Sequence, residues 1–240
     1  MWDRPELLTA TANLLYGLAV VALMYLVLIV TVHLPVFPVR EVKVMGAVSH
    51  VTRDQIETVV RNELKGNFFT ISLGGSRDAF EKLPWVRRVN VRRQWPDRLE
   101  VALEEHVALA RWGDEGLVNT LGEVFEAASD SRLPVFTGPK EASHDMAENF
   151  GRFQRVLTTV DKQVAEVNLS ARRAWRLRLA DGMTLELGRE QVVARLAKFA
   201  GAYASSVALM RAPPAVVDLR YPNGFAVRIR DLKWTGNTRV

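Results

Sequence analysis

The longest feature of the hydrophobic pattern is an apolar run near the N-terminus, from residue 14 to residue 34. No formally charged residue stands between Glu6 and Arg40, and the run lacks the polar face that a globular helix presents to water. Its length is close to the roughly 20 residues that cross a bilayer core. The pattern predicts a membrane-spanning helix over residues 14–34, preceded by a short cytoplasmic tail of residues 1–13.

A cleaved signal peptide is the alternative for such a run, but it has an apolar core of about 7–15 residues followed by small residues. Here the run ends on VTVHLP at residues 30–35, which offers no small-residue cleavage site. We therefore expect an uncleaved anchor. The flanking charges, Arg4 and the amino terminus against Asp3 and Glu6, do not decide its orientation.

After the apolar run the pattern changes to short elements in the order strand, helix, helix, strand, strand. Alternating valines predict a first strand that ends at Gly46. A capping box at residues 52–55 predicts a helix up to about residue 65, and Ser76 is expected to cap a second, shorter helix. These elements and the hairpin that follows predict a compact unit over residues 37–112.

The hairpin is predicted from two alternating runs, residues 86–94 and 99–105, which flank the turn sequence WPDR. The alternation favours one register, in which one face is apolar and the other carries charge pairs. The pairs expected opposite each other are Val89 and Leu103, Val91 and Val101, Arg88 and Glu104, and Arg92 and Glu100.

The remaining chain, residues 113–232, alternates short strand patterns with turns and predicts a β-rich domain with an antiparallel sheet and flanking helices. Two amphipathic helices are expected, at about residues 141–159 and 191–210. Strands are expected at residues 117–119, 123–125, 133–136, 164–170, 175–180, 183–187, 216–220 and 225–230. The fold class is therefore α+β, and residues 233–240 are left as a C-terminal tail.

Composition narrows the classes of function. The chain has no cysteine, which excludes disulfides and Cys-ligated metal sites. The net charge of +5 comes from basic residues interleaved with acids, so we expect no nucleic-acid partner. Nucleophile, phosphate-loop and dinucleotide motifs are absent, and the four histidines lack ligand spacing. The sequence predicts no catalytic residue, no cofactor and no metal.

Several sequence motifs make the chain similar to a known family. They are LPWV at residues 83–86, RRQWPD at 92–97, ARRAW at 171–175 and VDLRYPNGFAV at 217–227. Together they resemble the FtsQ family of bacterial cell-division proteins, called DivIB in Gram-positive relatives, whose first extracytoplasmic unit is a POTRA domain. The resemblance covers nearly everything after the apolar run. Two departures are the very short N-terminal tail and Ile229, where some relatives carry Trp.

The resemblance implies a type II single-pass protein of the bacterial inner membrane, with its C-terminal region in the periplasm at the division septum. It implies a non-enzymatic scaffold that binds the FtsB–FtsL pair through the β domain. The POTRA domain and the membrane helix would contact other septal division proteins. The alternatives are a POTRA-containing protein of another secretion or envelope-assembly system, and a membrane-anchored hydrolase whose catalytic side chains converge in one cleft.

The candidate binding site is the last expected strand, residues 225–230. No strand follows it in the sequence, so its outer edge is expected to remain open for a partner strand. Arginines and a tyrosine beside it would pair acidic groups and anchor the partner, whereas the simpler interpretation is that they only complete a sheet edge. The candidate residues are Arg172, Arg173, Arg220, Tyr221, Asn223, Gly224, Phe225, Val227 and Ile229.

Overall fold

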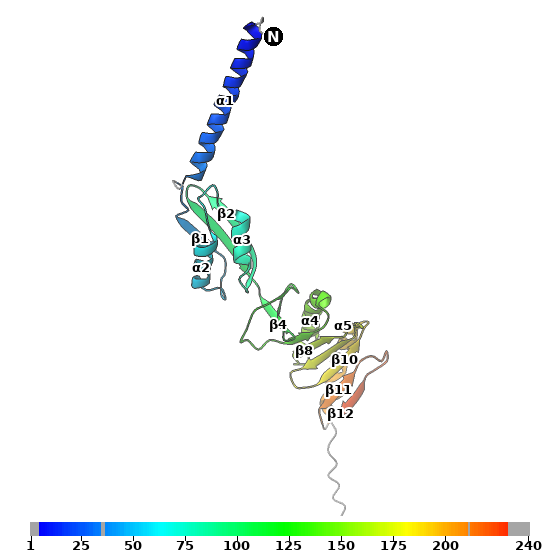
Figure 1. Cartoon of the computed structure of the whole chain (residues 1–240). Coiled ribbons are helices and arrows are strands. Elements are labelled where there is room, and N and C mark those ends of the chain that lie inside the picture. Colours follow the sequence, from blue (N-terminus) through cyan, green and yellow to red (C-terminus); the bar gives the residue numbers. More distant parts are fainter. Residues whose placement is uncertain (1–4, 35–36, 211, 230–240) are drawn as a thin grey trace, which may run out of the picture. The chain divides into compact units, whose positions relative to one another are not determined.

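The computed structural model describes residues 5–34, 37–210 and 212–229, and the chain divides into two compact units, Met1–Glu105 and His106–Val240 (Figure 1). Helix α1 (Pro5–His33) contains the predicted span. It also includes residues 5–13 of the expected tail, whereas residues 1–4 and the C-terminal tail 233–240 lie outside the described residues. Thr9–His33 is long and apolar enough to cross a membrane, and none of it is buried.

The rest of the first unit has the predicted order of elements. They are β1 (Glu41–Met45), α2 (Arg53–Glu63), α3 (Leu73–Glu81), β2 (Val86–Gln94) and β3 (Arg98–Glu105). The strands form a three-stranded sheet in the order β1-β3-β2, with β1 parallel and β2 antiparallel to the central strand. Both outer strands of this sheet are therefore edges within the described residues.

Local sequence explains where the helices of this unit begin. The predicted capping box is confirmed, since Thr52 accepts from the Gln55 backbone N–H and the Gln55 side chain accepts from that of Thr52. The predicted cap of α3 is wrong. Ser72 caps that helix by accepting from the Gly75 N–H at 3.1 Å, while Ser76 lies buried inside the helix and donates back to the Ser72 carbonyl.

The predicted hairpin register is confirmed pair by pair between β2 and β3. Val89, Val101 and Leu103 are buried on the inner face. The charged face differs in detail from the prediction. A register irregularity at Val86–Arg88 accompanies an ion pair of Glu104 with Arg87, at 2.7 Å. Glu100 is itself buried under the exposed Arg92.

The second unit is one nine-stranded sheet in the order β12-β11-β10-β9-β8-β7-β4-β5-β6. Its strands are β4 (Ala108–Trp112), β5 (Gly116–Asn119), β6 (Val124–Phe125), β7 (Val135–Thr137), β8 (Val164–Leu169), β9 (Trp175–Leu179), β10 (Thr184–Gly188), β11 (Pro214–Asp218) and β12 (Ala226–Ile229). Strand β4 pairs with β5 and β7. The sheet of the first unit thus ends at Glu105, and residues up to 112, expected in that unit, belong to the second.

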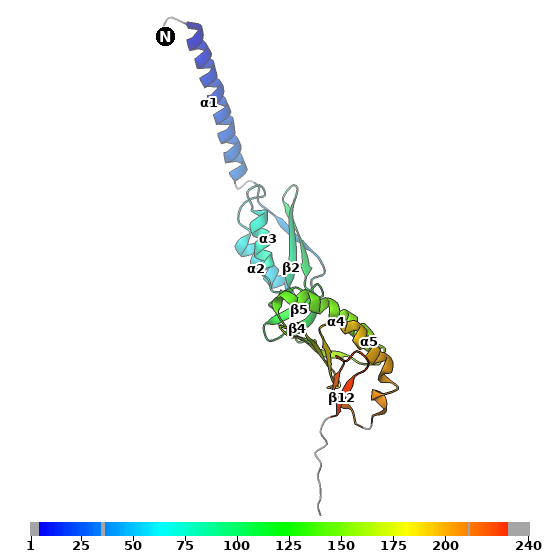
Figure 2. The same cartoon turned by 90° about the vertical axis from the view of Figure 1, so that its right-hand side faces the viewer.

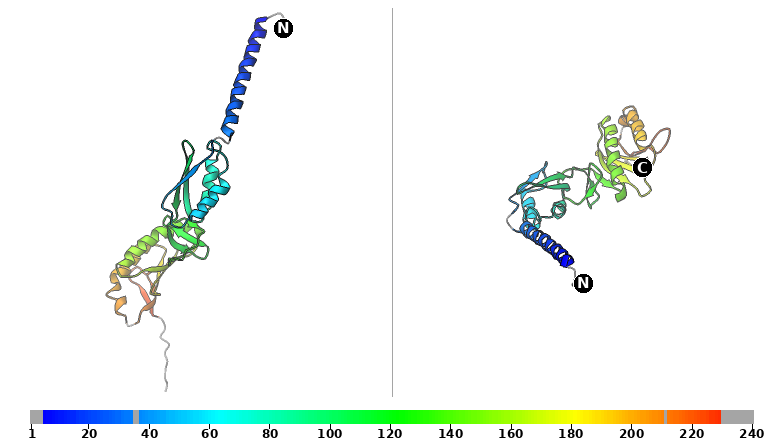
Figure 3. Two further views of the ribbon diagram at one scale, coloured as in Figure 1. Left: turned by 90° about the vertical axis from the view of Figure 1, so that its left-hand side faces the viewer. Right: turned by 90° about the horizontal axis from the view of Figure 1, so that it is seen from above.

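The prediction of an antiparallel sheet is only partly right, because β4–β7, β7–β8 and β10–β11 are parallel. Parallel neighbours need a crossover connection, and helices supply two of them. The helical elements are η1 (Lys140–Ala142), α4 (Ser143–Thr158), α5 (Val192–Tyr203) and η2 (Val207–Leu209). The two long helices pack against each other and against the sheet, α4 on β8 and α5 on β10 (Figures 2 and 3).

Helix α5 ends earlier than the predicted residue 210. Ser205 and Ser206 both donate their hydroxyls to the Ala202 carbonyl, at 3.2 and 2.5 Å. Side-chain hydrogen bonds of this kind compete with the helical ladder, and the chain passes into the short helix η2 instead. The face of α5 that carries Leu196 and Phe199 is buried against the sheet.

Candidate functional site

The candidate site is built around β12, the strand at one edge of the nine-stranded sheet. Among the described residues β12 pairs only with β11, in antiparallel register. Phe225 and Val227 are half-buried and pack against the core, whereas Ala226 and Arg228 are exposed on alternate positions. Because side chains alternate along a strand, β12 keeps its register by its inner face and leaves one backbone edge open.

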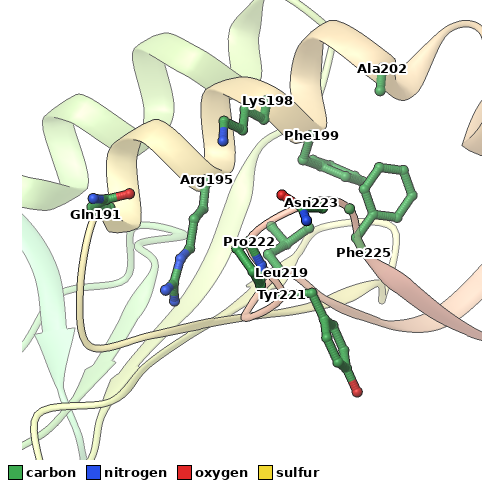
Figure 4. Close-up of a pocket in the computed structure, with 11 residues that line it drawn as sticks. Gln191, Arg195, Lys198, Phe199, Ala202, Leu219, Tyr221, Pro222, Asn223 and Phe225 are labelled. Carbon is green, nitrogen blue, oxygen red and sulfur yellow. The ribbon is translucent and has the colours of Figure 1, made fainter.

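A groove opens beside this strand, between helix α5 and the loop that leads into β12 (Figure 4). The loop is held by Leu219, which is buried, and by the Phe225 ring, which meets the Phe199 ring edge-on at a centroid distance of 5.7 Å. Tyr221 is 56% exposed, and its ring points away from α5. The groove residues are Gln191, Arg195, Lys198, Phe199, Ala202, Leu219, Tyr221, Pro222, Asn223, Gly224 and Phe225.

Arg220 lies just after β11, next to the acidic side chains of Asp218 and Glu186. Its guanidinium donates to both carboxylate oxygens of Asp218, at 2.8 and 2.6 Å, and lies 3.5 Å from Glu186. The hydrogen bond and charge of Asp218 raise the pKa of Arg220, and in turn the Arg220 hydrogen bond lowers the pKa of the Asp218 carboxyl. Arg220 is therefore already paired within the molecule.

The two arginines predicted from the β8–β9 turn do not join Arg220. Arg173 adopts a left-handed backbone conformation, with φ of 62°, and its side chain forms an ion pair with Asp145 of α4 at 3.2 Å. Arg172 is exposed on the same turn. Two other residues beside that turn, Ser170 and Ala174, nevertheless line one small hollow together with Arg220.

Other predicted site residues do gather. Tyr221, Asn223, Gly224 and Phe225 line the groove together, and Val227 and the exposed Ile229 continue along β12. Sequence reasoning missed the α5 side of the groove and Arg228. The signal for α5 was present, since one face of the helix carries the polar or small residues Gln191, Arg195, Lys198 and Ala202 at helical spacing.

The first unit carries a second groove, between β1 and α2. Its floor is aliphatic, with Val42, Val44, Ile56 and Val60 among its lining residues, and arginines 40, 53 and 61 stand at its rim. The free edge of β1 borders it. In the parts of the chain that the structure describes, no group of three or more His, Cys, Asp or Glu side chains is placed to hold a metal ion.

The fold defines the class as a POTRA-containing protein with an N-terminal helix of membrane-spanning length. Residues 37–106 match the family model "POTRA domain, FtsQ-type". Residues 110–220 match "Cell division protein FtsQ/DivIB, C-terminal". The chain therefore belongs to the FtsQ/DivIB family of cell division proteins, as the sequence motifs predicted.

Two relatives match nearly the whole chain. The cell division protein FtsQ of Nitrosospira multiformis is 45% identical over 233 residues, which is 95% of this chain and 99% of the relative. That of Burkholderia pseudomallei is 35% identical over 245 residues, which is 99% of this chain and 98% of the relative. The solved POTRA1-2 of the periplasmic domain of Omp85 from Anabaena covers 60% of this chain, at 16% identity and a TM-score of 0.25, and 95% of that structure is covered.

Proposed function

We propose that this protein is a non-enzymatic scaffold of the bacterial division machinery, anchored in the inner membrane by α1 with its C-terminal region in the periplasm at the septum. Its β domain binds the FtsB–FtsL pair through the open edge of β12. Family membership and the apolar helix support the division role and the anchor. The observation that carries the binding surface is the edge of β12, which no described strand covers.

Strand addition at this edge sets requirements on the partner. Main-chain hydrogen bonds supply affinity, while side chains of the added strand alternate between the two faces of the sheet. Residues on one face would meet Arg228, so acidic side chains suit them. Residues on the other face would meet Ile229, so apolar side chains suit them. The partner segment is therefore an extended stretch in which acidic and apolar residues alternate.

Tyr221 is the proposed aromatic anchor beside the added strand. Its ring is exposed and turned out of the groove, so it is available before binding. Arg220 contributes differently from a free cation, because Asp218 and Glu186 already pair with it. Through these ion pairs Arg220 fixes the chain just after β11, and a partner carboxylate would share its guanidinium with them. Arg228 is the cleaner probe of charge recognition, since it stands on β12 itself.

The test is a titration of the full chain in lipid nanodiscs with a peptide from the membrane-distal end of FtsB. Loss of a desolvated tyrosine at the centre of an interface costs about 2–4 kcal/mol, so Tyr221→Ala should weaken binding by roughly 30- to 1000-fold. Arg228→Glu should weaken it in a salt-dependent way. The matched control is Leu121→Ala, an exposed apolar side chain beside β6 at the opposite edge of the sheet.

Unchanged affinity in folded Tyr221→Ala and Arg228→Glu variants would remove the β12 edge from the mechanism. The next surface to test would then be the groove between β1 and α2 in the POTRA unit, as we call residues 37–105 of the first unit. We propose that this unit, together with the membrane helix, contacts other septal division proteins. The free edge of β1 and its aliphatic, arginine-rimmed groove support a second site for an extended segment.

A further inference from the structure

The end of the POTRA unit that follows α1 is fastened to the helix by a buried asparagine. The Asn67 side-chain amide donates to the backbone carbonyls of Val32 and Leu34, at 2.7 and 3.0 Å. Val32 lies in the last turn of α1 and Leu34 directly follows the helix, where carbonyls lack intrahelical partners. The Asn67 carbonyl oxygen accepts from the N–H groups of Phe69 and Thr70. The turn at residues 67–70 is therefore placed directly at the C-terminal end of the apolar helix.

Two more segments are tied to the same end. The Phe68 N–H donates to the Phe37 carbonyl at 2.8 Å, which joins the turn to the segment after α1. The Arg40 N–H donates to the Asp97 carbonyl at 2.9 Å, which joins that segment to the tip of the β2–β3 hairpin. Figure 2 shows the hairpin tip at the α1 end of the unit. A membrane crossed by α1 would lie beside all three segments.

Arg93 makes this arrangement stiff. Its guanidinium donates to the backbone carbonyls of Phe68, Phe69 and Ile71, at 2.7, 3.2 and 2.8 Å. Arg93 is on β2, so these bonds lock the turn to the hairpin strand. The end of the unit is a preformed surface and does not need a partner to order it.

Three aromatic rings project from this surface into solvent, one from each segment. Phe37 is 39% exposed, Phe69 is 46% exposed and Trp95 is 80% exposed. Phe37 and Phe69 pack edge to face, with ring centroids 5.2 Å apart. We call Phe37, Phe69 and Trp95 the aromatic platform. Each ring would contribute apolar contact area if it left water, because large aromatic side chains bury much area.

Basic side chains lie in the segments that carry the platform. Lys65, Arg40, Arg92 and Arg98 are exposed in the same three segments and the strands next to them. Acidic groups pair three of them, Arg40 with Asp97 at 3.7 Å, Arg98 with Glu41 at 2.9 Å and Arg92 with Glu100 at 2.6 Å, while the three guanidinium groups remain exposed to solvent. Aromatic rings mixed with Lys and Arg near the end of a membrane span are typical of the interface between hydrocarbon and lipid headgroups.

We propose that the aromatic platform enters the headgroup layer of the membrane that α1 crosses, with the Arg and Lys side chains of these segments contacting lipid phosphates. The proposal rests on α1 being a membrane span, and it is independent of the binding site on β12. The platform then attaches the POTRA unit to the membrane surface, and Asn67 attaches it to the end of α1. These two contacts hold the POTRA unit in one orientation relative to the membrane.

The absence of cysteine makes a depth measurement direct, because one introduced cysteine can be labelled alone. A nitroxide at Gln94→Cys reports on the hairpin tip. A second nitroxide, at Ser49→Cys, reports on the region just after the end of β1. The start of β1, in contrast, contacts the hairpin tip. The full chain is reconstituted in vesicles of phosphatidylethanolamine and phosphatidylglycerol. We expect the label at 94 to be protected from a water-soluble nickel quencher and accessible to oxygen, and the label at 49 to show the reverse.

The platform itself is tested by Phe69→Ser with Trp95→Ser in the Gln94→Cys background. Each ring should change the ratio of membrane-bound to unbound platform by about tenfold, so the label at 94 should return to an aqueous signal. The matched control is Leu121→Ser, an exposed apolar residue of the second unit, which should change nothing.

Two results would overturn the proposal. One is equal exposure of the labels at 94 and 49 to the aqueous quencher. The other is protection at 94 only after FtsB–FtsL is added, which would assign the platform to a protein partner. Failure at β12 in the peptide titration would leave the depth measurement unaffected, so the two proposals are tested separately.

Discussion

The POTRA unit and the second unit are each a sheet packed against two helices, but their hydrophobic cores differ in size. The main hydrophobic cluster of the POTRA unit has six buried residues, and α2 buries none of its side chains completely. The cluster of the second unit has 22 buried residues, including Phe136, Phe153 and Phe199. Hydrophobic stabilisation increases with the apolar area that is buried, so it contributes far more to the second unit than to the POTRA unit.

The smaller unit compensates with polar side chains that hold loops by hydrogen bonds to their backbone. Asn67 binds the end of α1 and its own turn, and Arg93 binds the same turn from β2. Glu105 accepts from the N–H groups of Ser49 and Val51 at 3.0 and 2.8 Å. A hydrogen bond contributes little net, but an unsatisfied buried partner is costly. The stability of the POTRA unit should therefore depend on single polar residues, and that of the second unit on core volume.

The largest effect is expected from a cavity in the second unit. Phe153 is fully buried and packs edge-on against Trp175, with ring centroids 5.4 Å apart. Phe153→Ala should lower the free energy of unfolding of this unit by about 3–5 kcal/mol. Urea unfolding of residues 37–240, followed by tryptophan fluorescence, measures it. A loss below about 1 kcal/mol would show that the large core tolerates volume changes and would weaken the comparison.

The second prediction concerns the polar side of the comparison. Asn67→Ala leaves the Val32 and Leu34 carbonyls and the turn N–H groups without their partner, and should destabilise the POTRA unit by about 2–3 kcal/mol. Asn67→Asp keeps the acceptor but places a buried carboxylate oxygen against the two carbonyls at the C-terminal end of α1, so it should destabilise the unit at least as much. The control is Asn62→Ala, an exposed position on α2, where a change within about 0.5 kcal/mol is expected. Hydrogen exchange at residues 67–70 in the full chain provides the measurement.

The sequence predicts the elements of both units well where the signal is local. The alternation of apolar and polar residues specifies the β2–β3 register because a slip of one residue would turn every side chain to the other face. The capping box at Thr52 is likewise a pattern of four adjacent residues. Ser72 was missed as a cap because Ser76, four residues later, satisfies the same preference for a serine before a helix.

What escaped prediction depends on contacts between distant residues. Strand β4 continues the alternation of the POTRA hairpin, and only its pairing with β5 and β7 assigns it to the second sheet. The polar contacts of Glu105 and Asn67 join residues more than 30 positions apart, so no local pattern reveals them. At the site, the exposure of Tyr221 agrees with the prediction, and among the described residues no second strand pairs with β12. The polar face of α5 is visible in the sequence, but its place as a wall of the groove is not, because that depends on the crossover that brings α5 beside the last hairpin.

The smallest expected effect comes from Glu105, the last residue of β3, whose side chain is only 7% exposed. Burial raises the pKa of this carboxyl, but the hydrogen bonds from the N–H groups of Val51, Ser49 and His50 together lower it by more. The pKa therefore lies below the usual 4.5. A carboxyl with a lowered pKa in the folded state contributes stability that is fully present above its usual pKa and is lost as the pH falls through the lowered one. The POTRA unit should therefore become less stable on acidification from about pH 4.5 downward.

The test is Glu105→Gln, because the glutamine side chain cannot ionise. This variant should lose about 1 kcal/mol of stability at neutral pH and lack this part of the acid dependence. Urea midpoints of both proteins from neutral to acidic pH provide the measurement. Parallel curves below pH 4.5 would show that the Glu105 charge is not what fastens residues 49–51, and that the smaller unit relies less on its polar contacts than its structure indicates.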